Sequence, residues 1–368
     1  MTEARRPFAT SAVAAPLRPG WLRRATAGVR RQPAAWFLAR RFAWSLVVLF
    51  VLATITFVLA RIVPADPAAF LAGQNASQAA ITSIRHEYGL DKPLDIQYIN
   101  YMSGLLRGSL GISIRTRDPV ASDMASYLPA TLELLFASFF VYVTASLLLG
   151  ITTAYHARGP FGVVVKLLTM AGTALPVFWI GAVLQLVFFY RLGWFPLGGR
   201  LGELATPPPQ VTGFYTIDSI LAGQWSTFVD AVAHLVLPSA AIVLSLLAVG
   251  MRQTQAAVMQ ELGRHYVRTA RGKGMSEPRI ALKHVLRNAL NPILTVTGVQ
   301  FGYMVSWVIL VEVVFNWPGI GLYAYQSFQV FDYAPIIAVT LIATVVFLAV
   351  NLLTDIAYAV LDPRVRRG

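Results

Sequence analysis

Six apolar segments, each about as long as a bilayer-crossing helix, constrain the fold of this chain more than any other feature of its sequence. They cover residues 42–62, 131–155, 163–190, 232–251, 293–315 and 335–360. A helix needs about 20 residues to cross a hydrocarbon core of about 30 Å. Only 13% of the residues are charged, against roughly 25% in soluble domains. The sequence therefore predicts an all-α membrane protein with six transmembrane helices, in which Pro176 and Pro238 are tolerated kinks.

The basic residues alternate between connections and so orient the predicted helices. Residues 1–41 hold nine arginines against one acid, and residues 252–292 hold eight basic residues against two acids. Because Lys and Arg accumulate in cytoplasmic segments, both termini and the 252–292 connection are predicted to be cytoplasmic. The net charge of +13 is then a topology signal and requires no nucleic-acid partner. The predicted organisation is a basic tail (1–41), a first transmembrane helix (42–62), an external loop (63–128), a core with five transmembrane helices (129–362) and a cytoplasmic tail (363–368).

The external loop carries the stretch "LDKPLDIQYINYMSGLLRGSLG". Asp91 is placed to cap a helix that has Pro93 in its first turn, and apolar residues then recur near helical spacing. This pattern predicts a short amphipathic helix on the outer membrane surface, with a loose interfacial loop as the alternative. A later external turn, "FNWPGIG" (315–321), either dips back into the mouth of the bundle or anchors its tryptophan at the interface.

The sequence offers no site for nucleotide or metal chemistry. The Gly272–Lys273 pair lacks the G-x-x-x-x-G-K-[ST] spacing that cradles phosphates. There is no cysteine, and the five histidines are scattered, so no catalytic residue, metal site or cofactor is expected in this chain. Ionisable and amide side chains within membrane spans often mark a transport path, although snorkelling or capping near a membrane face is the alternative for the charged ones. The candidates for the path are Glu133, Gln185, Glu312, Asn351 and Asp355.

The cytoplasmic connection 252–292 is far longer than a plain helix-to-helix link, which takes about two to eight residues. Apolar residues at helical spacing from Val258 predict one helix to about Arg271, which Gly272 and Gly274 would end. Ser276 is placed to cap a second amphipathic helix, which is predicted to run to Asn291–Pro292. The expected product is a helix, a tight glycine corner and a second helix that project from the membrane.

These features resemble the membrane subunit of bacterial ABC importers in the dipeptide/oligopeptide/nickel permease group. The resemblance covers about residues 42–367 and rests on four motifs in the same order. They are "YGLDKPLDIQYINYMSGLLRGSLG" followed by "LPATLELL", then "YVRTARGKGMSEPRIALKHVLRNALNP", "FNWPGIG" and "LDPRVR". The group's cytoplasmic loop has the general form E-A-A, three residues, then Gly. Here Arg268 and Thr269 stand where Glu and the first Ala would be, followed by Ala270 and Gly274, so the acidic residue is absent.

The resemblance implies a type I ABC importer permease fold with a cytoplasmic coupling helix, in a non-catalytic subunit of the bacterial inner membrane. It implies a second homologous permease subunit, two ATPase subunits that bind ATP and Mg, and an external substrate-binding protein. The coupling residues would be Tyr266, Arg268, Thr269, Ala270, Arg271, Gly272, Lys273, Gly274, Met275 and Ser276. The candidates for an external gate or for contact with the binding protein are Tyr98, Tyr101, Trp317, Pro318 and Gly319.

A peptide is the expected substrate, and nickel chelates or oligosaccharides are the alternatives within the same group. A stand-alone secondary transporter is a second hypothesis, but it would call for charges at mid-membrane or for inverted repeats. A membrane-anchored scaffold that binds nucleic acid through the basic tail is a third, and it leaves the structured cytoplasmic connection unexplained.

Overall fold

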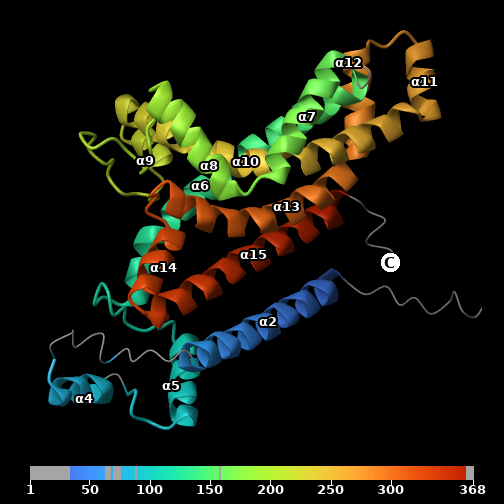
Figure 1. The fold of residues 1–368 in the computed structure, drawn as a ribbon. Helices are drawn as coiled ribbons and strands as arrows, with labels where there is room; N and C mark the ends of the chain where they lie inside the picture. The colour runs from blue at the N-terminus through green and yellow to red at the C-terminus, as the bar shows by residue number, and fades with distance from the viewer. Residues whose placement is uncertain (1–33, 63–67, 69–75, 88, 157–158, 362–368) are drawn as a thin grey trace, which may run out of the picture.

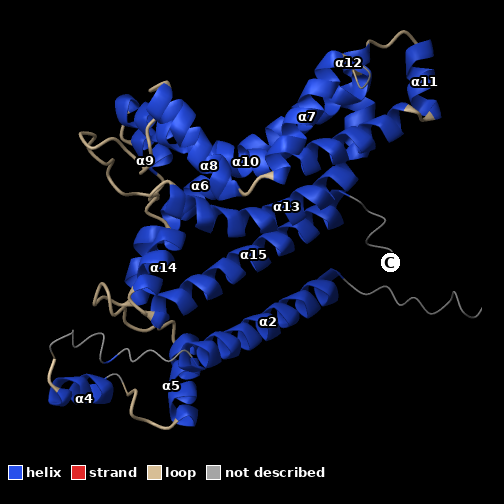
Figure 2. Cartoon of the chain, in the orientation of Figure 1, coloured by secondary structure: helices blue, strands red, loops and turns tan. Residues whose placement is uncertain are grey.

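The computed structural model describes residues 34–62, 68, 76–87, 89–156 and 159–361. Within these ranges the chain is almost entirely helical and contains no strand (Figure 2). The expected tails fall largely outside the described residues, at 1–33 and 362–368. The first helix, α2 (Ala34–Ile62), begins earlier than predicted, so residues 34–41 are already helical.

Five helices in the described part of the chain are long and apolar enough to cross a membrane. They are α2, α6 (Val120–Tyr155), α10 (Trp225–Leu262), the rod made of α12 (Glu277–Ile280), η2 (Ala281–Leu286) and α13 (Arg287–Val314), and α15 (Tyr333–Leu361). They coincide with the first, second, fourth, fifth and sixth predicted spans. The start of α2, the end of α15 and the start of α12 lie toward the same end of the bundle (Figure 1).

The third predicted span is broken into two helices. α7 (Pro160–Ala174) is followed by α8 (Val177–Leu184), which runs into the π-helical turn η1 (Gln185–Arg191), and the two arms are bent by 113°. Leu175 is extended, with φ −101° and ψ 143°, a conformation that the proline after it favours. The expectation of a tolerated kink at Pro176 was therefore wrong, whereas Pro238 does lie inside a continuous α10. Six spans result only if the bent pair counts as one.

Helices α6 and α10 form the centre of the bundle and approach each other through small residues. Gly150 on α6 faces Thr254 on α10, and Gly250 on α10 faces Tyr142 and Ser146 on α6. A Cβ atom added to Gly250 would lie 2.6 Å from the Ser146 Oγ and closer still to the Tyr142 Oη. Close approach through glycine is how membrane helices gain packing contacts when lipid removes the hydrophobic driving force between them.

A Gly250→Ala substitution is therefore expected to destabilise the chain by about 1–3 kcal/mol, the usual cost of overpacking a tight core. Thermal unfolding in detergent measures the effect. Gly263→Ala is the matched control, because its added Cβ would meet no atom closer than 3.6 Å. Equal melting temperatures for the two variants would contradict the close approach of α6 and α10.

Four short helices gather at the end of the bundle away from α12 (Figure 1). They are α4 (Gln78–Glu87), α5 (Leu94–Leu106), α9 (Tyr215–Leu221) and α14 (Ile320–Gln329). The helix predicted in the first external loop is present as α5. Asp91 does not cap it; its carboxylate lies 2.7 Å from the His86 Nδ1 instead. This hydrogen bond lowers the pKa of Asp91 below its ordinary value.

Candidate functional site at the α11 corner and the α13–α15 groove

The predicted glycine corner follows α11 (His265–Gly272). Gly274 has a φ of +75°, in the left-handed region that glycine enters without steric cost. The N–H of Met275 donates to the Ala270 carbonyl at 3.2 Å, and the N–H of Gly274 donates to the Arg271 carbonyl at 2.9 Å. These bonds satisfy carbonyl groups at the end of α11 and turn the chain into α12.

Three details of this region differ from the prediction. The first helix does not run unbroken to residue 271, because Arg264 is extended, with φ −72° and ψ 150°, and α11 begins anew after it. Ser276 makes no capping hydrogen bond through its side chain. The second helix does not end at Pro292, which lies inside α13, since packing in a bundle tolerates a proline within a membrane helix.

The corner has one buried face and one exposed face. Val267 and Ala270 are 0% and 7% exposed and belong to an apolar cluster with Ile280 and Val285, against which Tyr266 and Met275 are half-buried. Ala270 is thus turned toward its own chain. The exposed residues are Arg268, Thr269, Arg271, Gly272, Lys273, Gly274 and Ser276.

Arg271 closes the corner by pairing with Glu277 at the start of α12. Its Nε donates to the Glu277 Oε1 at 2.5 Å, and its Nη2 donates to the Oε2 at 3.1 Å. This hydrogen bonding raises the pKa of Arg271 above its ordinary value. Arg268 and Lys273 form no ion pair with any described residue, so their charges remain available on the exposed face.

A groove of about 670 Å³ lies between α13 and α15 and reaches α14 at its outer end. Its polar lining consists of Tyr303, Ser306, Thr340, Thr344 and Asn351, and none of the described residues that line it is charged. Gly302 makes room for the Phe347 ring, which a Cβ atom at that position would overlap. The groove therefore offers hydroxyl and amide groups along an otherwise apolar wall.

The residues predicted for the path lie in different places. Asn351 lines the groove, and the Asp355 side chain lies outside the described residues. Gln185 donates to the carbonyl groups of Leu197 at 2.9 Å and Val314 at 3.2 Å, so it ties the loop after η1 to the end of α13.

Two of the three predicted membrane carboxylates, Glu312 and Glu133, are engaged inside the chain. Glu312 is fully buried and accepts from the N–H groups of Gly321 at 2.6 Å and Leu322 at 3.3 Å, where it caps the start of α14. Glu133 is 4% exposed and pairs with the Arg200 Nη2 at 2.5 Å. Neither lines the groove, and the contacts of each carboxylate inside the chain account for its burial.

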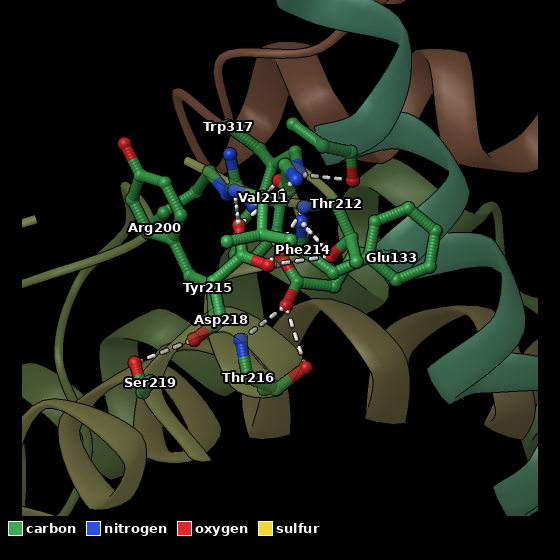
Figure 3. A network of polar contacts seen from close by, with 12 residues as sticks. Glu133, Arg200, Val211, Thr212, Phe214, Tyr215, Thr216, Asp218, Ser219 and Trp317 are labelled. Carbon is green, nitrogen blue, oxygen red and sulfur yellow. Dashed lines mark hydrogen bonds and ion pairs between the residues drawn. The ribbon is translucent and has the colours of Figure 1, made fainter. Parts of the chain in front are cut away.

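Arg200 organises the loop that follows η1 (Figure 3). Besides Glu133 it donates to the Gly213 carbonyl at 2.7 Å, and its guanidinium lies 3.5 Å from the centre of the Tyr215 ring and 5.9 Å from that of Trp317. In the sequence, the prolines and glycines of residues 198–231 indicate only an irregular loop. No spacing pattern connects two partners 67 positions apart, so sequence reasoning missed Arg200.

The carboxylate of Asp218 stabilises the same loop through hydrogen bonds with loop residues. Its carboxylate accepts from the Thr212 hydroxyl at 2.7 Å and from the N–H groups of Val211, Thr212 and Gly213 at 2.8 to 3.2 Å (Figure 3). Burial by itself would raise the pKa of Asp218, but these hydrogen bonds outweigh it and the pKa is lowered. The loop is thus ordered by its own hydrogen bonds, and the ion pair of Arg200 with Glu133 attaches it to α6.

Two family models together cover nearly the whole helical part of the chain. Residues 146–367 match the family described as "Binding-protein-dependent transport system inner membrane component", and residues 35–135 match the N-terminal part of membrane components of such systems. The chain belongs to this family.

Curated relatives match this permease along almost their full length. It is 36% identical over 334 residues to the probable D,D-dipeptide transport system permease protein DdpB of Escherichia coli K12. It is 39% identical over 333 residues to the di/tripeptide transport system permease protein DppB of Pseudomonas aeruginosa UCBPP-PA14. Each alignment covers 90% of this chain and 98% of the relative. The permease is thus a multi-pass membrane component of a binding-protein-dependent transport system.

Two residues of the candidate external gate, Trp317 and Gly319, are buried in this permease. Trp317 is 1% exposed and donates through Nε1 to the Ala130 carbonyl at 2.9 Å, so the "FNWPGIG" turn inserts its tryptophan into the bundle and does not anchor it at an interface. Gly319 is also buried, and Pro318 is half-buried. Tyr98 and Tyr101 of α5 pack on Phe57 of α2, with ring centres 5.3 and 5.4 Å away.

Proposed function

We propose that this permease forms half of the translocation path of an ATP-driven importer for di- or oligopeptides, which an external binding protein delivers. The observation that carries the proposal is the match along 90% of the chain to permeases named for dipeptide and for di/tripeptide transport. The fold we propose is that of a type I ABC importer permease, in which the bent α7–α8 pair counts as the third of six spans and both termini are cytoplasmic.

In this proposal α11 is the coupling helix that docks on one of two ATPase subunits, which bind ATP and Mg. Support comes from its two faces: an exposed face with Arg268 and Lys273, and a buried face that packs against the ends of α6, α10 and α13. Closure of the ATPases would move the corner, and the packed helices would carry that motion into the bundle.

The groove between α13 and α15 is proposed as this subunit's half of the path, and a second homologous permease subunit would supply the other half. Its hydroxyl and amide groups can hydrogen-bond a peptide backbone, since that backbone has both donors and acceptors. Its uncharged lining suits peptides with side chains of either charge, which leaves selection to the binding protein.

Reversing both charges on the exposed face, by Arg268→Glu together with Lys273→Glu, should weaken co-purification of the ATPase subunits by at least about tenfold, because like charges across an interface are costly. The matched control is Lys283→Glu with Arg287→Glu, which changes the net charge equally at two exposed positions outside α11. If the control variant lost as much ATPase, a general effect of net charge would replace the docking face.

ATP hydrolysis by the purified chain and by the assembled complex tests the proposed function. The isolated chain should hydrolyse no ATP, and the complex should hydrolyse it faster when the binding protein is loaded with a dipeptide. Stimulation by a nickel chelate or an oligosaccharide, with no response to peptides, would reassign the substrate. Hydrolysis by the isolated chain would overturn the assignment.

A further inference from the structure

The hydroxyl group of Tyr266 joins the three helices that meet at the corner. Tyr266 lies in the first turn of α11, and its Oη donates to the Glu261 Oε2 at 2.6 Å, in the last turn of α10. The same oxygen accepts from the Asn288 Nδ2 at 3.1 Å, in the first turn of α13. A single side chain therefore bridges α11 to both α10 and α13.

Helix α11 needs such a bridge because the helical backbone is interrupted on each side of it. Gly263 and the extended Arg264 precede it, and Gly274, at φ +75°, follows it. Its other attachments are the apolar contacts of Val267 and Ala270 and the exposed ion pair of Arg271 with Glu277, which ties α11 to α12 alone. Apolar burial has no preferred direction, whereas hydrogen bonds constrain both distance and angle. Without the hydroxyl group, no side-chain hydrogen bond among the described residues would join α11 to α10 or α13, and α11 could shift relative to both.

We propose that Tyr266 is a positioning residue that makes α11 move as one body with α10 and α13, so that a displacement of α11 reaches the groove. Asn288 belongs to the helix that also carries Tyr303 and Ser306 of the groove lining. The inference rests on the proposed function, in that α11 receives its motion from an ATPase.

The protonation state of the Tyr266 hydroxyl group suits this positioning role. Burial raises the pKa of Tyr266, and the hydrogen bond to Glu261 raises it further. The phenol therefore stays protonated near neutral pH and donates to a carboxylate, a charge-assisted bond that is shorter and stronger than a neutral one. Glu261 is itself partly buried, with 15% of its side chain exposed, and has Arg264 at 3.6 Å.

Tyr266→Phe in the assembled importer tests the proposal, because it removes the hydroxyl group and keeps the ring. In proteoliposomes the variant should hydrolyse ATP at close to the unmodified rate. The amount of dipeptide transported per ATP should fall about fivefold or more, the lower end of typical coupling between sites. Tyr155→Phe is the matched control, since Tyr155 packs against the same cluster and its hydroxyl has no hydrogen-bond partner among the described residues. It should leave the ratio unchanged.

An unchanged ratio of dipeptide to ATP in Tyr266→Phe would overturn the proposal. A proportional loss of hydrolysis and transport would overturn it too, since that result indicates misfolding rather than uncoupling. Absence of dipeptide uptake by the unmodified complex would instead refute the proposed function, and Tyr266 would then be tested by a distance measurement that needs no substrate.

Distances between spin labels supply that second readout. The chain has no cysteine, so labels can be placed at His265→Cys on α11 and Met259→Cys on α10, both of which are exposed. With Tyr266 present, the complex should give one narrow distance distribution, and Tyr266→Phe should broaden it. Identical distributions would show that the hydroxyl group does not hold α11 in place.

Discussion

An Arg200→Leu substitution should destabilise the permease by about 3–5 kcal/mol, because it leaves a buried charge without its partner. The charge left behind is the carboxylate of Glu133, whose side chain is 3% exposed beside an arginine that is 8% exposed. The Gly213 carbonyl would also lose its donor. Thermal unfolding of the purified chain in detergent measures the loss.

Arg191→Leu is the control, since it removes the same charge from an exposed position on η1. A Glu133→Leu/Arg200→Leu double variant should recover part of the stability, because neither charge is then buried alone. If Arg200→Leu unfolds at the same temperature as Arg191→Leu, the ion pair does not hold the external loop to α6.

A Gly274→Val substitution should abolish co-purification of the ATPase subunits while leaving the chain inserted in the membrane. Gly274 has a φ of +75°, and an added Cβ would meet no atom of the chain within 4 Å. The new side chain would therefore project from the exposed face into the proposed partner. The left-handed conformation costs a non-glycine residue roughly 1–2 kcal/mol, so the corner would also be strained.

Gly223→Val separates the effect on docking from the effect of strain. Gly223 has a φ of +69° and equally open surroundings, but it follows α9, at the end of the bundle opposite α11 (Figure 1). This variant carries a similar backbone cost and should retain the ATPase subunits. Equal retention by both variants would remove α11 from the docking surface.

The features that the sequence predicted correctly are those governed by local chemistry. Hydropathy over about 20 residues located five spans as single helices, because burial in lipid constrains every residue of such a segment. The corner at Gly274 was predictable for a similar reason: a left-handed residue after a helix strongly favours glycine.

The features that the sequence did not predict depend on partners far away in the chain. Pro176 breaks its span while Pro238 lies within a helix, and the two prolines have the same intrinsic effect, so the surrounding helices decide the outcome. The pairing of Arg200 with Glu133 and the burial of Trp317 likewise join separate segments. Whether Ala270 faces inward or outward follows from packing on α12 and η2, which a lone alanine does not reveal.

Uptake of a labelled dipeptide into proteoliposomes tests the central claim most directly. The vesicles would contain this chain with the second permease subunit and both ATPase subunits, with loaded binding protein on the external side and ATP on the other. Accumulation that requires both the binding protein and ATP is the predicted result. Dipeptide uptake by this chain alone, or by the complex without ATP, would contradict the account.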